Sequence, residues 1–452
     1  MARVLLIGDG GQPTGFERVC RAIGTALVAA GHTVVQRAQG YDPRKPLDIE
    51  YPYTIRPTWS QADDPFGVTK VPRWLMEDKP DVVMMVQDLW NEVNYAAQMP
   101  EELPIVGYFP VDAPHLKWSY GLALGRFTRA IPYTHFGAKE AALSARAAAD
   151  MTAMVNPGRL DEETDWLAMR NYDMTLPIYP SRLGPRQNVS AYTPIPHGLD
   201  KDMFQPMNKA ECRRSMGIPE DAFVVLNVNT NQFRKRLDIT VRGFAELAKW
   251  NKKALLLLHC SNGDAGGWDL LELAQLYGVA DRMACVHHTK QHLTDQELKV
   301  LYNTADIQVN TGGGEGWGLP SFDGALCGIP QMVPNWSATR ELWAEDGVLL
   351  PIKDYRIPEK WSTTAHACVN AEAYGRLLVQ LSKDSDLLAE LGGKARRFAL
   401  AQPSWEEVGA RFVTQIEEAL LEPTPKPLSI REMLALRDGD LESELKSFTN
   451  FG

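Results

Sequence analysis

The sequence has few cysteines and none of the spacings that would organise them. Its six cysteines are scattered through 452 residues, and the chain has no C-x-x-C pair and no Cys/His pattern typical of a zinc site. Most of them fall within apolar runs. This favours buried thiols in a reducing compartment over a disulfide framework.

The sequence also lacks a long hydrophobic run and an excess of positive charge. The longest apolar stretch, around residues 254–258, is far shorter than the roughly 20 residues of a membrane-spanning helix. Its first residues show neither the basic start nor the cleavage site of a signal peptide, so we expect a cytoplasmic protein without a transmembrane segment. A formal net charge of −10 excludes general attraction to nucleic acid over the whole surface, although a local basic groove stays open. The oligomeric state has no signature in the sequence.

Short apolar runs alternate with amphipathic stretches along the chain. Strand-like runs occur at residues 4–7, 33–35, 82–86 and 105–109 in the first half and at 223–228, 254–258, 283–286, 306–309 and 331–333 in the second. Such alternation is typical of parallel sheets with crossover helices. It predicts an α/β protein with two Rossmann-like, doubly wound domains facing a central cleft.

The first run is followed by a helix whose ends can be recognised. Thr14 and Glu17 form a capping-box pattern ahead of an apolar helical face, and Gly31 stands where the helix can end. A segment rich in Pro, Gly and Asn then separates the two halves of the chain. We predict domains over residues 1–198, with an insertion near 150–190, and over 199–400. Residues 401–452 are expected to form a helix that packs back toward the first domain, followed by a polar tail.

The strongest local signal is the glycine-rich segment from Thr311 to Asp323. It follows a predicted strand and opens a helix with Pro320 in its first turn. The glycines allow close approach of the backbone, and the N–H groups of Gly318, Leu319 and Ser321 can face a diphosphate at the positive helix end. Taken alone, the same pattern fits a glycine turn before a core helix.

The acids of this segment carry a family resemblance. The run Glu315-Gly-Trp-Gly-Leu-Pro-Ser-Phe-Asp323 resembles the donor-binding signature of family 4 retaining glycosyltransferases, in which two acids are separated by seven residues. The likeness continues through residues 325–330 to Glu341, and it also includes 302–306 and 195–200, the last similar to the family's linker into the second domain.

The resemblance implies a GT-B fold and a metal-independent transfer that retains the anomeric configuration. A sugar would move from a nucleotide-diphosphate sugar, with UDP-sugar favoured over GDP- or ADP-sugar, to a hydroxyl acceptor, and no cofactor would be bound permanently. The first domain would bind the acceptor, and the second would bind the donor. In the family the first acid contacts the transferred sugar and the second holds the ribose, roles that pass to Glu315 and Asp323. Asp323 stands where the family has Glu, and Gly316, Gly318 and Leu319 would contact the donor.

A basic run follows the predicted strand 223–228. Arg234 and Lys235 resemble the family's basic pair at this strand end, which implies that they neutralise the leaving diphosphate. The family's earlier arginine in this loop is absent, with Asn229 or Thr230 in its place. We therefore expect Arg236 to share the work.

Two loops of the first half are further candidates. The glycine loop at residues 8–15 resembles the family's loop near the donor phosphates and acceptor, with Gly11 as the expected contact; a simple tight turn would have the same sequence. After the run 105–109 the family commonly places a His that faces the reacting centre. Asp112 fits that register better than His115, and its carboxylate could accept the acceptor's proton or steady the cationic sugar.

Two possible metal motifs are rejected. His287 and His288 are adjacent and cannot share the i, i+4 face of a helical metal site. Asp438 and Asp440 mimic the metal-binding acid pair of the other glycosyltransferase fold, but they lie in the polar tail.

The acceptor stays open among a glycan, a lipid and a modified base in DNA. Residues 13–18 and 108–112 resemble glycosyltransferases of phages and archaea, some of which act on hydroxymethylated pyrimidines; a phage protein would work in the host cytoplasm. Trp118 and Tyr120 could stack on bases. Positive charge in the first half comes from Arg126, Arg129, Arg146, Arg170, Arg182 and Arg186. A nucleotide-sugar epimerase or a catalytically silent nucleotide-sugar-binding protein could carry the same motifs, and both stay open.

Overall fold

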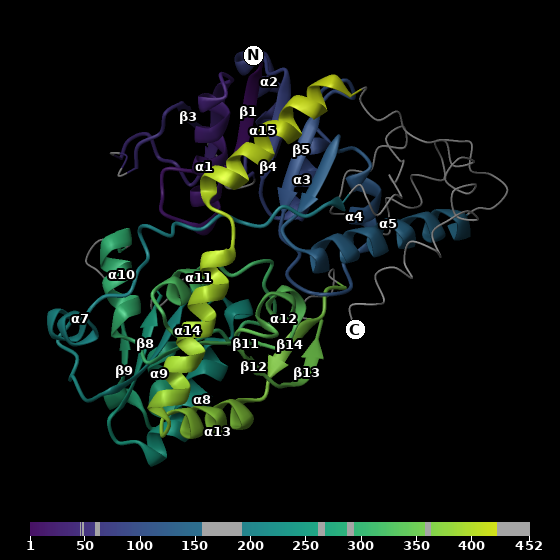
Figure 1. Cartoon of the computed structure of the whole chain (residues 1–452). Coiled ribbons are helices and arrows are strands. Elements are labelled where there is room, and N and C mark those ends of the chain that lie inside the picture. Colours follow the sequence, from purple (N-terminus) through teal and green to yellow (C-terminus); the bar gives the residue numbers. More distant parts are fainter. Residues whose placement is uncertain are drawn as a thin grey trace. The chain divides into compact units, whose positions relative to one another are not determined.

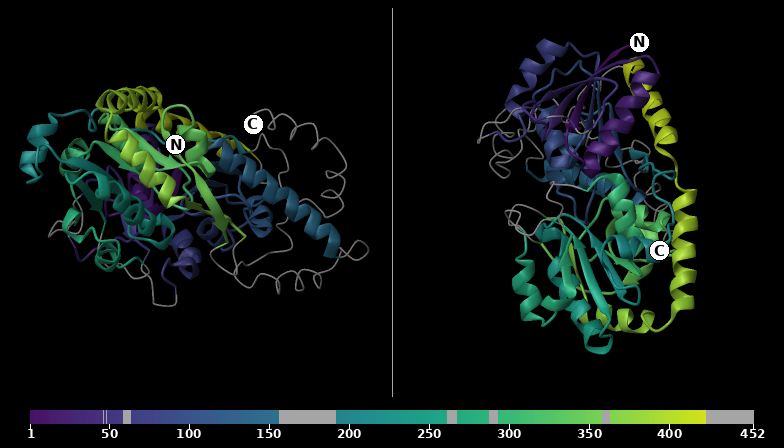
Figure 2. Two further views of the ribbon diagram at one scale, coloured as in Figure 1. Left: turned by 90° about the horizontal axis from the view of Figure 1, so that it is seen from below. Right: turned by 90° about the vertical axis from the view of Figure 1, so that its left-hand side faces the viewer.

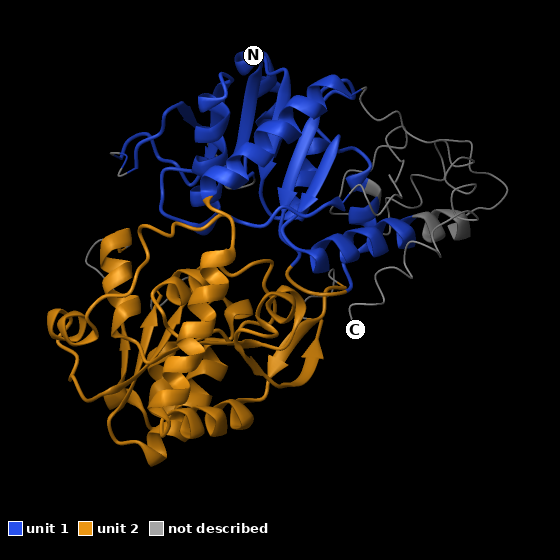
Figure 3. Cartoon of the chain, viewed as in Figure 1, with its two compact units in different colours: residues 1–111, 115–197, 405–452 blue, residues 112–114, 198–404 orange. Residues whose placement is uncertain are grey.

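The computed structural model divides the chain into two compact units, each with its own parallel sheet (Figures 1 and 3). Unit 1 comprises residues 1–111, 115–197 and 405–452, and unit 2 comprises 112–114 and 198–404. The structure describes residues 1–45, 47, 49–58, 64–155, 192–260, 267–286, 293–357 and 363–422. Most of the predicted insertion near 150–190 and the polar tail from residue 423 therefore lie outside the described residues.

Unit 1 is built on six parallel strands in the order β3-β2-β1-β4-β5-β6. This is the strand order of a Rossmann fold, in which the direction of winding reverses between β1 and β4. Its elements are β1 (Arg3–Asp9), α1 (Gly15–Ala29), β2 (Thr33–Gln39), β3 (Thr54–Pro57), η1 (Val68–Lys70), α2 (Val71–Asp78), β4 (Val82–Val86), α3 (Leu89–Ala96), β5 (Ile105–Phe109), α4 (Trp118–Leu124), β6 (Arg129–Pro132), α5 (His135–Val155) and α15 (Trp405–Leu421).

The predicted ends of the first helix are partly confirmed. Thr14 is the N-cap of α1 and accepts the N–H of Glu17, and Gly31 follows the helix with φ of 89°. The capping box is incomplete, however, because the Glu17 carboxylate accepts hydrogen bonds from Tyr51 and Arg21 instead of returning to the cap. The Thr14 hydroxyl donates to Asp9 at 2.8 Å and so joins the end of β1 to the start of α1.

The last described helix, α15, belongs to unit 1 although it is far from the rest of the unit in sequence. It lies along α1 in Figures 1 and 2. A Cβ atom on Gly409 would come within 2.5 Å of the Ala26 side chain, so the two helices approach closely at this glycine. A helix appended after unit 2 thus completes the surface of unit 1.

Unit 2 repeats the architecture with parallel strands in the order β12-β11-β10-β7-β8-β9. The reversal of winding falls between β7 and β10. Its elements are α7 (Lys209–Ser215), β7 (Phe223–Val228), η4 (Phe233–Lys235), α8 (Leu237–Trp250), β8 (Ala254–His259), α9 (Leu270–Leu276), η5 (Ala280–Arg282), β9 (Met283–Cys285), α10 (Asp295–Thr304), β10 (Ile307–Val309), α11 (Leu319–Leu326), β11 (Gln331–Pro334), α12 (Ser337–Trp343), β12 (Val348–Leu350), β13 (Ile352–Arg356), β14 (His366–Val369), α13 (Ala371–Leu381) and α14 (Ser385–Ala401).

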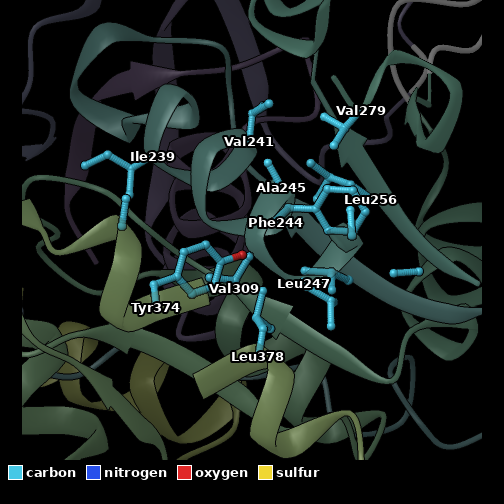
Figure 4. Packing of buried hydrophobic residues seen from close by; sticks show 14 of the residues in the cluster. Ile239, Val241, Phe244, Ala245, Leu247, Leu256, Val279, Val309, Tyr374 and Leu378 are labelled. Carbon is cyan, nitrogen blue, oxygen red and sulfur yellow. The ribbon is translucent and has the colours of Figure 1, made fainter. Parts of the chain in front are cut away.

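The core of unit 2 is dominated by side chains of α8, α13 and the central strands (Figure 4). Phe244, Leu247, Leu256 and Tyr374 are fully buried there. Helices α8 and α13 cross so closely that a Cβ on Gly243 would fall 1.9 Å from the Tyr374 ring. This packing anchors the strands whose carboxyl ends carry the charged loops described below.

The described residues contain neither a membrane span nor a metal cluster. None of the helices they form is long and apolar enough to cross a bilayer. The same part of the chain holds no group of three or more His, Cys, Asp or Glu side chains placed to bind a metal ion. The motifs at His287, His288, Asp438 and Asp440 lie outside the described residues.

Candidate active site

Two charged loops follow the strands at which the winding of the unit 2 sheet reverses. The basic run that contains Arg234 follows β7, and the glycine-rich segment that contains Glu315 follows β10. These strands are direct neighbours, so their carboxyl ends open at the same place on the sheet edge. In open α/β sheets this is where ligands bind.

The structure brings Lys235 and Glu315 into an ion pair. Lys235 Nζ donates to Glu315 Oε1, and both side chains are buried, with 12% and 8% of their surface exposed. Asn310 Nδ2 donates to the same carboxylate oxygen at 3.3 Å. Because a buried charge is costly unless it is paired and hydrogen-bonded, the two loops depend on each other.

The electrostatics of the pair favour an ionised carboxylate. Burial acts to raise the pKa of Glu315, but the neighbouring cations Lys235 and Arg234 outweigh it, so the pKa lies below the ordinary value of 4.5. Burial, reinforced by Arg234, lowers the pKa of Lys235 despite its pairing with Glu315. A fixed negative charge therefore stands between two cations at the sheet edge.

Arg234 extends the cluster to Asp112. Its Nη1 atom donates to the Gly314 carbonyl and lies 3.3 Å from Asp112 Oδ2 and 3.7 Å from Glu315 Oε2. Residues 112–114 are part of unit 2, whereas His115 is part of unit 1. The His115 backbone has φ of 67° and donates its N–H to Glu140. Of the two candidates after β5, the structure thus joins Asp112 to the charged cluster.

Arg236 does not share this position, contrary to the expectation from the sequence. Its guanidinium makes two hydrogen bonds of 2.9 Å to Asp238 and one of 3.5 Å to Cys368 Sγ. The residue has φ of 51° and forms the N-cap of α8. Its charge balances Asp238 in the first turn of that helix, and Arg234 is the arginine that reaches Glu315.

Glycines of the segment from Thr311 to Asp323 make close contacts with other parts of the protein's own backbone. Gly313 donates its N–H to the Arg234 carbonyl at 2.8 Å and accepts the N–H of Ala367 at 2.7 Å. A Cβ on Gly314 would come within 2.3 Å of the Asp112 carbonyl oxygen. Close approach of other backbone segments therefore requires glycine here.

The N-terminus of α11 is arranged partly as predicted. Gly318 is its N-cap with φ of 91° and no side-chain cap, and Pro320 occupies the first turn. Ser321 donates its N–H to the Gly318 carbonyl at 3.0 Å, so this amide is already bonded and the expectation that it faces a ligand is wrong. Leu319 and Asp323 are buried, with 9% and 2% exposed. Gly316, between Glu315 and the helix, is also buried.

A stack of three side chains steadies the basic loop. Phe233 stacks on the ring of Trp268, with centroids 4.6 Å apart and planes 15° from parallel, and the guanidinium of Arg356 lies 5.0 Å from the Phe233 centroid. Asn231 adds two hydrogen bonds of 2.9 Å to the Trp268 backbone. Since Phe233 directly precedes Arg234, the stack restricts where that cation can point.

Two residues of the site were not foreseen. Asn310 holds both Glu315 and the Gly312 N–H, and Ser337 lies 3.4 Å from the backbone N and O of Glu315 with its own φ at 47°. Asn310 could have been noticed as an amide directly after a buried strand. Ser337, more than twenty residues further on, gives no such signal.

Unit 1 has a smaller polar cluster where its own winding reverses. Asp9 ends β1 and accepts hydrogen bonds from Thr14 at 2.8 Å and from Gln87, directly after β4, at 3.1 Å. Burial raises the pKa of Asp9, and these two bonds act against it. Gly11 has φ of 75°, and its N–H donates to Tyr51 Oη at 2.8 Å, so a ligand that used this amide would have to displace Tyr51.

The side chains considered for DNA contacts are largely engaged in unit 1. Arg126 is 7% exposed and donates to the carbonyls of residues 100 and 103, and Arg129 pairs with Glu422. Tyr120 packs against the core. Arg146 is exposed. Arg170, Arg182 and Arg186 lie outside the described residues.

Sequence comparison relates the chain to glycosyltransferases. No family model matches it. A D-inositol 3-phosphate glycosyltransferase of Thermobispora bispora is 28% identical over 243 residues, 52% of each chain. D-inositol 3-phosphate glycosyltransferase 2 of Catenulispora acidiphila is 33% identical over 136 residues, 29% of this chain and 32% of that protein. The chain thus spans about half the length of the first relative and about a third of the second.

Solved structures show the fold. HepE of Anabaena in complex with UDP-glucose matches with a TM-score of 0.63 at 12% identity over 92% of this chain and 100% of that chain. Sucrose-phosphate synthase of Thermosynechococcus elongatus matches with a TM-score of 0.61 at 18% identity over 93% and 99%. Together with the sheet order of both units, these findings confirm the two predictions on fold and kinship: the chain is related in sequence to glycosyltransferases and has their GT-B fold.

Proposed function

We propose that this protein is a retaining glycosyltransferase that moves a sugar from a nucleotide-diphosphate sugar to a hydroxyl acceptor. The observation that carries the proposal is the cluster of Lys235, Glu315 and the partly exposed Arg234 where the winding of the unit 2 sheet reverses. Two cations and the positive end of α11 suit a diphosphate, and a carboxylate beside them suits sugar hydroxyls.

The donor half of the mechanism is charge stabilisation. The bond between the anomeric carbon and the diphosphate oxygen breaks, and its electron pair leaves with the diphosphate. Arg234 and Lys235 offset the negative charge that develops there, and loss of one such contact lowers the rate by about 10²- to 10³-fold. Glu315 orients the transferred sugar, and Asp323 binds the ribose. Because Asp323 is buried, the start of α11 has to open for the nucleoside to reach it. No metal ion takes part in this scheme.

The acceptor half uses Asp112. The acceptor oxygen forms its bond to the anomeric carbon on the face that the diphosphate leaves, which retains the configuration. When Arg234 turns to the diphosphate, the Asp112 carboxylate is released from its 3.3 Å contact and can accept the proton of the acceptor hydroxyl.

The names of similar proteins guide the choice of substrates to test. HepE was solved with UDP-glucose, which favours a UDP-sugar as the first donor. The curated relatives are named D-inositol 3-phosphate glycosyltransferases, which favours a phosphorylated polyol as the first acceptor. Glycan, lipid and hydroxymethylated DNA complete the acceptor panel, with GDP- and ADP-sugars as further donors.

The test is release of nucleoside diphosphate across this panel, with product stereochemistry read by NMR. We expect release that depends on one donor and one acceptor, with retention at the anomeric carbon. Binding of donors with no acceptor-dependent release would show a silent binding protein, and an altered sugar without transfer would show an epimerase; either result contradicts the proposal.

A matched pair of arginine variants tests whether activity depends on an arginine of the site rather than on any arginine of unit 2. Arg234→Met removes a cation that reaches Glu315, whereas Arg242→Met removes an exposed arginine of α8 that pairs with Glu372. We expect turnover to fall by about 10²-fold or more in the first variant and to stay unchanged in the second. Equal activity in both would refute the role given to Arg234.

A further inference from the structure

A row of polar side chains in unit 2 is joined by hydrogen bonds and ends on the backbone of the basic loop. Its members are Asn227 in β7, Asn229 directly after this strand, Thr240 in α8 and Thr311 shortly after β10. Asn229 Nδ2 donates to Asn227 Oδ1 at 2.8 Å, and Asn227 Nδ2 donates to Thr240 Oγ1 at 2.9 Å. The hydroxyl oxygens of Thr240 and Thr311 are 2.6 Å apart, and Thr311 Oγ1 donates to the Arg236 carbonyl at 2.9 Å.

This polar row is buried except at its outer end. Asn227, Thr240 and Thr311 are at most 1% exposed, whereas Asn229 is only partly buried. A buried hydroxyl or amide is costly unless it is hydrogen-bonded, and an apolar side chain of the same shape would fill the space without that need. A fully bonded row of this kind makes its surroundings rigid.

The direction of each hydrogen bond in the polar row follows from the number of hydrogens available. A hydroxyl group has one hydrogen to donate, and Thr311 uses it on the Arg236 carbonyl. Thr240 must therefore donate the bond between the two threonines, and its oxygen accepts from Asn227. All bonds thus point the same way, which strengthens the last one, from Thr311 to the Arg236 carbonyl.

The polar row completes a support on both sides of Lys235. The carbonyl before Lys235, that of Arg234, accepts a backbone N–H of the glycine-rich segment at 2.8 Å. The carbonyl after it, that of Arg236, accepts the Thr311 hydroxyl. Arg236 has φ of 51°, which is unfavourable for a residue with a side chain, so its carbonyl needs contacts that hold it in this direction. With both carbonyls held, the Lys235 side chain is directed at Glu315.

We propose that Thr311, supported by Thr240 and Asn227, is a positioning residue that holds the backbone around Lys235 so that its ammonium group stays against Glu315. These residues act through Lys235 and need not touch a donor. The effect on turnover rests on the proposed transferase function. The effect on Lys235 is a property of the folded chain and can be measured without any donor.

The first measurement is the rate at which acetic anhydride labels Lys235 in the folded full chain, read by mass spectrometry against the exposed Lys353 of the same unit. Thr311→Val keeps the shape of the side chain but removes the hydroxyl, so we expect Lys235 to be labelled several-fold faster. Thr311→Ser keeps the hydroxyl and should be labelled at the wild-type rate. Thr240→Val removes only the support of the Thr311 hydroxyl, so it should give a smaller acceleration.

Thr304→Val is the matched control, since Thr304 is also fully buried in unit 2 and its hydroxyl donates to the Leu301 carbonyl at 2.7 Å. It should leave the labelling of Lys235 unchanged. Equal labelling of Lys235 in Thr311→Val and Thr311→Ser would overturn the proposal, and so would an equal acceleration in Thr304→Val. If Thr311→Val does not fold, Thr240→Val decides, and a wild-type rate in that variant overturns the proposal.

The second measurement is turnover of the same variants. Lys235 offsets charge that develops as the diphosphate leaves, so a misplaced ammonium group should lower kcat more than it raises KM for the donor. We expect kcat to fall by about tenfold in Thr311→Val, less than for loss of the whole contact, and to recover in Thr311→Ser. An unchanged kcat in a variant whose Lys235 is labelled faster would refute the role of Lys235 in the transfer, and not its positioning by Thr311.

Discussion

At the scale of single residues, stability and function need different things from the pair of Lys235 and Glu315. Stability requires only that neither charge is left alone, whereas function requires both charges. Lys235 is the cation nearest to the Glu315 carboxylate, so removing it leaves this buried charge with only the more distant Arg234 at 3.7 Å. We predict that Lys235→Met lowers the free energy of unfolding by about 3 kcal/mol, the cost of breaking a buried pair. Urea denaturation measures this loss.

The double variant Lys235→Met/Glu315→Gln separates the two consequences. Both replacements conserve volume, and glutamine can still accept the hydrogen bond of Asn310. We expect most of the lost stability to return, while release of nucleoside diphosphate stays abolished because the charges that act on the donor are gone. A double variant as unstable as Lys235→Met, or one with restored turnover, would show that the charges do not act in this way.

A second residue, Glu92 of α3, is buried for a different reason. Its Oε1 atom accepts the N–H groups of Gln87 at 3.2 Å and Tyr108 at 3.1 Å, which ties the ends of β4 and β5 together. Within the described residues its Oε2 atom has no hydrogen-bond partner, and burial raises the pKa of the carboxyl well above 4.5. Glu92 is therefore neutral in the folded protein over a range of pH in which the unfolded chain has released the proton.

The raised pKa of Glu92 predicts a pH-dependent loss of stability. As pH rises above 4.5, only the unfolded state loses this proton, so the free energy of unfolding falls until the folded pKa is reached. Glu92→Gln cannot ionise, and its stability relative to the wild type should improve from about pH 5 to about pH 8. Urea denaturation at both pH values tests this, with Glu102→Gln, at an exposed glutamate of unit 1, as control. A difference between Glu92→Gln and wild type that does not change with pH would contradict the argument.

At the scale of elements, the start of α11 depends on one backbone conformation. Gly318 has φ of 91°, yet a Cβ there would meet nothing within 4 Å, so any cost of substitution comes from conformation and not from a clash. We predict that Gly318→Ala lowers the free energy of unfolding by about 1–2 kcal/mol. Gly318→Asn should cost less, because asparagine tolerates positive φ. Denaturant titration compares the two, and equal losses would point to a cause other than strain.

The strands show which elements a sequence reveals. The runs at 82–86, 105–109 and 223–228 coincide with β4, β5 and β7, which are central strands with apolar residues on both faces. Three strands that were not predicted, β3, β6 and β12, all lie at sheet edges. An edge strand is covered less completely and needs no continuous apolar run, so its sequence resembles that of a loop. The two-stranded sheet of β13 and β14, in which β13 is mostly exposed, escaped prediction for the same reason.

At the scale of the whole molecule, the sequence predicts which loops form the site but not which side chains of those loops contact each other. The order of strands and loops, together with the family resemblance, was enough to expect Arg234, Lys235 and Glu315 near one sheet edge. It could not show that Arg234 rather than Arg236 reaches Glu315, since both follow the same strand and only the fold of η4 and α8 separates them. Partners such as Ser337 come from elements that pack against the loop after folding, and no spacing rule finds them.

The division into units yields a last prediction, that residues 198–404 fold and bind a nucleoside diphosphate without the rest of the chain. This segment holds the complete sheet β7–β12 and its own core. Its two ends are paired, because Leu199 donates its N–H to the Pro403 carbonyl at 3.0 Å and bridges to Ser404. Excision removes residues 112–114, which costs Arg234 its contact with Asp112 but leaves the pair of Lys235 and Glu315 intact.

We therefore expect cooperative unfolding of the fragment and a dissociation constant for UDP within about tenfold of that of the full chain, equivalent to about 1.4 kcal/mol. Calorimetry measures both, and Lys235→Met in the fragment should abolish binding. A folded fragment that does not bind a nucleotide bound by the full chain would show that the diphosphate site needs residues outside this segment.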